Sequence, residues 1–94
     1  MVRPIKPRCI KNKPEVYYFK PQGIPLRNLK EIVISIDELE ALRLSDVENF
    51  TQIVAAKSMQ ISQPTFARIL NRAHQKVSQA IIGGFAIKIE QKVQ

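Results

Sequence analysis

The stretch TQIVAAKSMQISQPTFARILNRAHQKVSQAII, residues 51–82, decides the fold that we expect. It reads as a short helix, a break at residues 60–62 and a longer helix that starts at Gln63. Thr51 and Ser62 precede the two helices, and a hydroxyl at that position can accept a backbone N–H that the first turn leaves unpaired. Pro64 suits the first turn of the second helix and prevents the first helix from running through. Short helix, turn and long helix is the helix-turn-helix plan.

The second helix has two different faces when its residues are placed about 100° apart around the axis. Its apolar side chains fall on one stripe, which we expect to be buried: Phe66, Ile69, Leu70, Ala73, Val77, Ala80 and Ile81. The opposite face carries cationic, amide and hydroxyl groups and no acid: Thr65, Arg68, Arg72, Gln75, Lys76 and Gln79. Such a face is either simply solvated or fitted to nucleic acid, and the capped helix before it favours nucleic acid.

The charge of the chain supports an anionic partner. The 94 residues carry a net charge of +7, with a pI of about 9.9. Residues 1–30 and 51–94 are basic, with net charges of +7 and +5, whereas residues 31–50 have a net charge of −5. A basic side that faces DNA fits this pattern better than a uniform polycation does.

The rest of the chain is expected to support these two helices. Residues 1–14 form a basic arm rich in proline, and residues 15–94 form one domain that is mainly α. Short strands are predicted near residues 16–19, where the residue types are β-prone, and near 31–36 and 85–90, where apolar side chains alternate. A third helix follows Ser35 or Asp37, with Leu39, Leu42 and Val47 as its apolar stripe and Leu44 as a further apolar residue. The fold class is therefore a three-helix bundle with flanking strands, which pair either within one chain or across a dimer.

Candidate contact residues follow from this arrangement. The first turns of the outer face are expected to read base edges, through Gln63, Thr65 and Arg68. Three further side chains are expected at phosphates: Ser62, Arg72 and Lys76. Cations of the arm either follow a DNA groove or only solubilise the chain: Arg3, Lys6 and Arg8.

Other function classes lack support in the sequence. Cys9 is the only cysteine, so there is no internal disulfide, and no spacing of residues predicts a metal or cofactor site. The acids Asp37, Glu38 and Glu40 suit the positive end of a helix better than an acid–base site. His74, the only histidine, has no catalytic partners in a recognisable motif. No apolar run is long enough to span a membrane, so we expect a cytoplasmic protein without enzyme activity.

Several segments resemble one small prokaryotic family along nearly the whole chain. They are FKPQGIPLRNL, IDELEALRLSDVE, AAKSMQISQPTFARIL and the ending AIKIE. The members of that family are uncharacterised and are predicted to bind DNA through a winged-helix-like domain, with a helix-turn-helix similar to that of the fourth region of sigma factors. The resemblance implies DNA binding and transcriptional regulation without enzyme activity.

This chain departs from the family pattern at three places. Gln60 replaces the usual glycine of the turn, where a left-handed backbone is less comfortable for a residue with a side chain. Ile53 and Val54 replace two glutamates and add apolar surface. Gln63 and Pro64 replace an Arg-Gln pair at the start of the second helix.

We therefore expect sequence-preferring binding of double-stranded DNA by a transcriptional regulator that is a candidate homodimer. One alternative is a sigma-like adaptor that binds another protein through its acidic helix. The other is an RNA-binding protein that uses the arm and the tyrosines Tyr17 and Tyr18, although these side chains also suit a small core.

Overall fold

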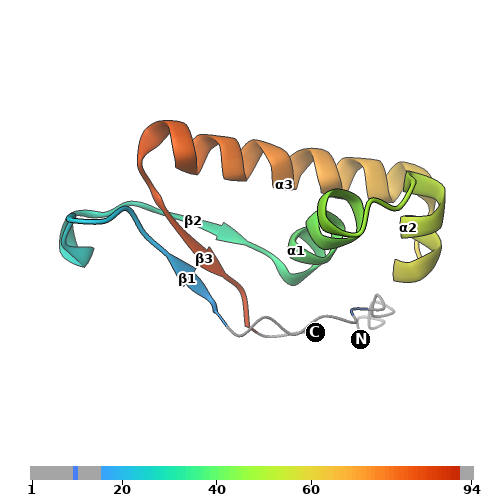
Figure 1. The fold of residues 1–94 in the computed structure, drawn as a ribbon, viewed down its shortest axis with the longest axis horizontal. Helices are drawn as coiled ribbons and strands as arrows, with labels where there is room; N and C mark the ends of the chain where they lie inside the picture. Colours follow the sequence, from blue (N-terminus) through green and yellow to red (C-terminus); the bar gives the residue numbers. More distant parts are fainter. Residues whose placement is uncertain (1–9, 11–15, 92–94) are drawn as a thin grey trace, which may run out of the picture.

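A computed structural model describes residue 10 and residues 16–91. In this part of the chain three helices accompany a small three-stranded sheet (Figure 1). The elements follow one another as β1 (Tyr18–Phe19), η1 (Leu26–Asn28), β2 (Glu31–Ile34), α1 (Ile36–Leu42), η2 (Arg43–Val47), α2 (Gln52–Met59), α3 (Gln63–Gly83) and β3 (Ala86–Ile89). None of the described helices is long and apolar enough to cross a membrane.

The sheet has the order β1-β3-β2, so the last strand of the described chain lies in the centre. β3 is antiparallel to β1, with Tyr18 opposite Lys88, and parallel to β2, with Glu31 opposite Ala86. All three strands lie within the segments that the sequence predicted, and they pair within one chain. Gly84 ends α3 in the left-handed conformation, at φ 71°, and lets the chain turn back into β3.

The supporting helix begins as its sequence predicts. The Ser35 hydroxyl accepts the backbone N–H of Glu38, while the Glu38 side chain accepts the backbone N–H of Ser35, which is a capping box. From Arg43 to Val47 the helix widens into a π turn. The wider turn changes which side chains face inward, so that Leu44 is 1% exposed and Val47 is 71% exposed. The prediction that Val47 belongs to the buried stripe was wrong, and Leu44 takes that place.

α2 and α3 have the boundaries that the capping residues predict. The hydroxyl of Thr51 accepts the N–H of Val54, and that of Ser62 accepts the N–H of Thr65. Between the helices Gln60 has φ 61° and ψ 42°, so it adopts the left-handed conformation despite its side chain. Its N–H bonds to the carbonyls of Ala56 and Lys57, which closes the end of α2. The turn therefore forms without glycine, in a conformation that is strained for a residue with a side chain.

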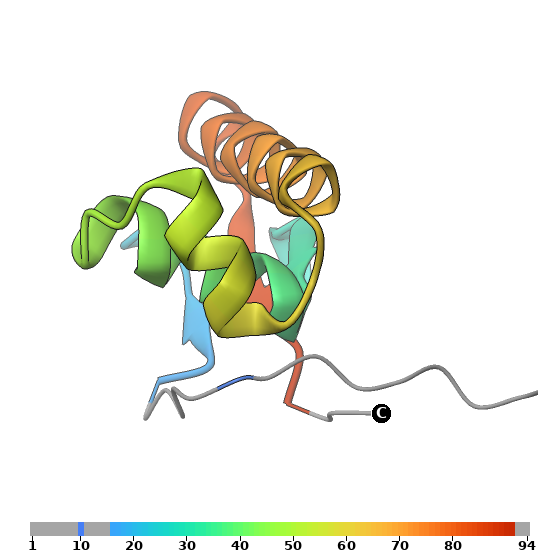
Figure 2. The same cartoon turned by 90° about the vertical axis from the view of Figure 1, so that its right-hand side faces the viewer.

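The main core lies where α1, η2, α2 and the first half of α3 meet. It is built from small and large apolar side chains: Ala41, Leu44, Ala55, Ala56, Met59, Phe66, Ile69 and Leu70. Figure 2 shows α2 beneath the start of α3 in the end-on view, whereas in Figure 1 the second half of α3 runs above the sheet. Ile81, which was expected in the buried stripe of α3, is instead 71% exposed, because neither the other helices nor the sheet cover this side of α3.

Candidate nucleic-acid interface

The outer surface of the first turns of α3 is open. Gln63 and Arg68 are exposed, and Thr65 is half-buried beside the Ser62 cap. The Ser62 hydroxyl donates to the Thr65 hydroxyl oxygen at 2.8 Å, and Arg68 Nη2 lies 3.5 Å from that same oxygen. Within the described chain Arg68 makes no ion pair, so its charge is not neutralised by a neighbouring acid.

Gln63 has a partner that the sequence did not indicate. Its side-chain Nε2 donates a hydrogen bond to Oε1 of Gln52, the first residue of α2. Both side chains are exposed, so the contact joins the starts of two helices at the surface. The sequence places each glutamine directly after a capping residue, but only the angle between the helices brings the two amides together.

One turn further along α3 the cations are tied into the protein. Glu38 of α1 is 2% exposed and holds two of them. Arg72 Nε donates to Glu38 Oε2 at 3.0 Å, and Lys76 Nζ donates to Glu38 Oε1 at 2.8 Å. Lys76 Nζ also donates to the carbonyl oxygen of Val33 at 2.8 Å. These contacts join α3 to α1 and to the edge of β2.

Arg72 and Lys76 differ in how many N–H donors they keep for another partner. Arg72 keeps 57% of its side chain exposed, and the Nε contact leaves the N–H groups of its two Nη atoms for another acceptor. Lys76 is 30% exposed, and its partners use two of the three N–H bonds of the ammonium group. The expected phosphate contact of Lys76 stays a prediction, but it would have to use the one remaining N–H.

The ion cluster fixes the charge of Glu38. Burial alone would raise the pKa of this carboxyl, but hydrogen bonds from Lys76, the Ser35 backbone and Arg72 outweigh it, and the net pKa lies below the ordinary value. Glu38 is therefore ionised at neutral pH, and the three side chains together carry a net charge of +1. The first-turn acid does more than complement the helix dipole, because it anchors the helix that carries the candidate contacts.

Other polar groups of the bundle are also paired. Arg43 contacts the buried Glu40 at 2.8 Å and the half-exposed Glu48 at 3.1 Å, and the bond to Glu40 raises the pKa of Arg43. Nε2 of His74 lies 2.7 Å from Oδ2 of Asp46, with both side chains about half exposed. These pairs link α1, η2 and α3 and need no catalytic explanation.

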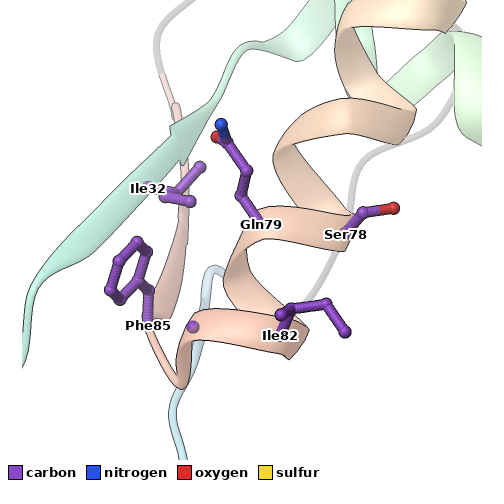
Figure 3. A pocket seen from close by; sticks show the side chains of 6 residues that line it. Ile32, Ser78, Gln79, Ile82 and Phe85 are labelled. Carbon is purple, nitrogen blue, oxygen red and sulfur yellow. The ribbon is translucent and has the colours of Figure 1, made fainter.

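A shallow pocket lies at the far end of α3, away from the candidate interface (Figure 3). Its volume is about 530 Å³, and its lining is mostly apolar: Ile32, Ser78, Gln79, Ile82, Gly83 and Phe85. None of these side chains titrates, so the pocket offers no acid, base or nucleophile of the usual strength. No group of three metal-binding side chains occurs within the described residues.

Two sets of predicted features cannot be placed. Arg3, Lys6 and Arg8 of the basic arm lie outside the described residues, and so does Cys9. The contacts that the structure adds instead are made by Gln52 and Glu38. The sequence marks Glu38 only as an acid in the first turn of its helix, and it indicates no partner for Gln52. Both contacts join side chains that are distant in the chain, at separations of 11 residues for Gln52 and Gln63 and 34 for Glu38 and Arg72.

Comparison with known proteins places the chain in a family. Residues 1–92 match the model described as "Protein of unknown function DUF134". A UPF0251 protein of Halothermothrix orenii is 48% identical over 90 residues, which cover 96% of this chain and 67% of that protein. A UPF0251 protein of Thermoanaerobacter pseudethanolicus is 46% identical over 90 residues, which cover 96% of this chain and 76% of the relative.

A third UPF0251 protein, from Prosthecochloris aestuarii, is 51% identical over 88 residues, which cover 94% of this chain and 57% of the relative. No solved structure matches the chain. The match to the family model runs through nearly all of the sequence, and the relatives align over almost the same length. The chain therefore belongs to the DUF134, or UPF0251, family of prokaryotic proteins.

Proposed function

We propose that α2 and α3 form a helix-turn-helix that binds double-stranded DNA with sequence preference, and that the protein is a transcriptional regulator. The observation that carries this proposal is the open, acid-free surface at the start of α3. There Gln63 and Arg68 present an amide and an unneutralised guanidinium beside a capped turn. In a helix-turn-helix the same turns of the second helix approach base edges in the major groove.

The proposed footprint divides the side chains by what they can reach. Gln63, Thr65 and Arg68 contact bases, and Ser62 and Arg72 contact phosphates. Arg72 is suited to a phosphate because Glu38 holds its Nε, which orients the exposed end of the guanidinium. Lys76 contributes less, since Glu38 neutralises much of its charge. The basic arm and a second copy of the chain are further proposed parts of the complex.

Selection of bound duplexes from a random pool tests this proposal with the full chain. We expect enrichment of one motif, and a symmetric motif would indicate that a homodimer binds. Affinity for the selected duplex should fall steeply as salt rises, because cations that contact phosphates displace counterions. A pool that stays random after repeated rounds, with no retention of duplex at low salt, would contradict DNA binding.

Exposed apolar side chains favour a second function, that of a protein-binding adaptor. Val47 is 71% exposed, Ile53 63% and Val54 48%, and they lie on η2 and α2 rather than on α3. Replacing Ile53 and Val54 with glutamate would abolish partner binding but not DNA binding if α2 is an adaptor surface. The opposite pattern, with loss of function only in Arg68 variants, favours DNA.

RNA binding has less support, because the Tyr18 hydroxyl already donates to Glu31 at 2.7 Å.

A further inference from the structure

The hydrogen bond between Gln52 and Gln63 determines which donors and acceptors of each side-chain amide remain for another molecule. An amide nitrogen carries two N–H bonds, and the carbonyl oxygen accepts two hydrogen bonds. Gln63 Nε2 uses one N–H on Gln52 Oε1. Gln63 therefore keeps one N–H donor and its carbonyl oxygen, while Gln52 keeps both N–H donors of its own nitrogen. Neither side chain has another partner within the described residues.

The groups that remain on Gln63 match one base. In the major groove adenine offers the N6 amino group as a donor and N7 as an acceptor, and a glutamine amide binds both at once. Guanine offers two acceptors there, N7 and O6. Gln63 could satisfy guanine only by turning its second N–H away from Gln52, which would leave Oε1 of Gln52 without its donor.

We infer that Gln63 recognises an adenine in the major groove and that Gln52 is the positioning residue that fixes the direction of the Gln63 amide. The inference rests on the proposed DNA-binding function and deepens it by naming a base and a second residue. The side-chain amide nitrogen of Gln52, with its two unused N–H bonds, can then donate to a phosphate, since the first helix of a helix-turn-helix crosses the DNA backbone.

The test uses the full chain and the duplex selected by the wild-type protein. Each adenine of the motif is replaced in turn by 7-deazaadenine, which lacks the N7 acceptor but still pairs with thymine. We expect one position at which this change weakens wild-type binding by roughly 3- to 10-fold, the effect of one lost hydrogen bond. Gln63→Ala should bind the modified and unmodified duplexes equally.

Variants of Gln52 separate positioning from simple contact. Gln52→Ala should lower the preference for adenine over guanine at that position by roughly fivefold or more. Gln52→Glu keeps an oxygen that accepts from Gln63 but repels phosphate, so it should retain the adenine preference and bind all duplexes more weakly. Gln22→Ala is the matched control, because Gln22 is an exposed glutamine outside α2 and α3 and should leave the preference unchanged.

The outcomes distinguish the inference from the function beneath it. If a motif is selected but no adenine in it depends on Gln63, the inference is wrong and DNA binding stands. An unchanged base preference in Gln52→Ala would remove Gln52 from its positioning role. If no motif is selected at all, both fail together. Thermal melting of each variant within error of the wild type would exclude unfolding as a cause.

Discussion

Arg68 and Arg72 are one turn apart on α3 and carry the same guanidinium group, but the structure uses them differently. Arg68 contacts only the Thr65 hydroxyl within the described chain, whereas Arg72 is bound to a buried carboxylate. Lys76 continues the second arrangement and reaches both Glu38 and β2. The comparison teaches that a basic helix face is not one functional unit, because Arg68 has no acid partner within the described chain and the cations of the middle turns hold the bundle together.

Removal of Glu38 should have the largest effect on this comparison. Glu38→Ala removes the hydrogen bonds that this carboxylate accepts from Arg72, Lys76 and the Ser35 backbone, so we expect the free energy of unfolding to fall by about 3–5 kcal/mol. Urea denaturation measures this loss. The control is Glu48→Ala, whose surface pair with Arg43 should be worth about 1 kcal/mol or less. Equal small losses in both variants would show that the Glu38 cluster does not anchor α3.

Lys76 gives the next largest effect. Lys76→Ala removes charge-assisted hydrogen bonds to Glu38 and Val33, and we expect a loss of stability of about 1.5–3 kcal/mol. Lys57→Ala, which removes an exposed cation from α2, should change stability by about 0.5 kcal/mol at most. The salt dependence of DNA binding is measured on the same proteins. The quantity compared is the slope of the logarithm of the binding constant against the logarithm of the salt concentration. If this slope becomes shallower by about 0.9 in Lys76→Ala alone, Lys76 contacts a phosphate after all.

Acid should weaken the same cluster. The pKa of Glu38 in the folded protein lies below its ordinary value of 4.5, so the folded state binds this proton less readily than the unfolded state does. The stability that the ionised Glu38 contributes is present above about pH 4.5 and is lost as the pH falls through the pKa of Glu38 in the folded protein. Between pH 5 and pH 3 the wild type should therefore lose more stability than Glu38→Gln. Parallel curves for the two proteins would contradict the assignment.

The smallest expected effect comes from the turn before α3. Gln60 has φ 61°, a conformation that glycine adopts without strain, so Gln60→Gly should raise the free energy of unfolding by roughly 1 kcal/mol. Because the turn keeps its geometry, affinity for DNA should not change. Asn49→Gly is a useful control, since Asn49 also has φ 61° but asparagine tolerates this region better. Destabilisation by Gln60→Gly would mean that the glutamine side chain does more than fill the turn.

Local patterns in the sequence predicted the local structure well. Thr51 and Ser62 cap α2 and α3 as predicted, because capping depends on nearby backbone groups. The alternation of Ile32 and Ile34 likewise marked a strand. The wrong prediction for Val47 has a different origin. The π turn adds a residue to the helical turn, and no Pro or Gly in this segment indicates it. The side chains that follow therefore point in other directions than a regular α-helix would give them.

The candidate site was less predictable, because helical periodicity gives a direction but not a neighbour. Helical spacing placed Arg72 and Lys76 on the outer face of α3. It did not show that α1 packs close enough for the Glu38 carboxylate to contact both side chains. Gln52 and Gln63 meet for the same kind of reason, through the angle at Gln60. Ion pairs and hydrogen bonds between elements depend on tertiary packing, which a single sequence does not encode in any short motif.

The most direct test of the central claim is the ratio of affinities for the selected duplex and a scrambled duplex, measured for wild type and Arg68→Ala at one salt concentration. If the first turns of α3 read bases, the ratio should fall by about 5- to 150-fold, equivalent to 1–3 kcal/mol, while the melting temperature stays the same. An unchanged ratio in a folded Arg68→Ala protein would contradict the account.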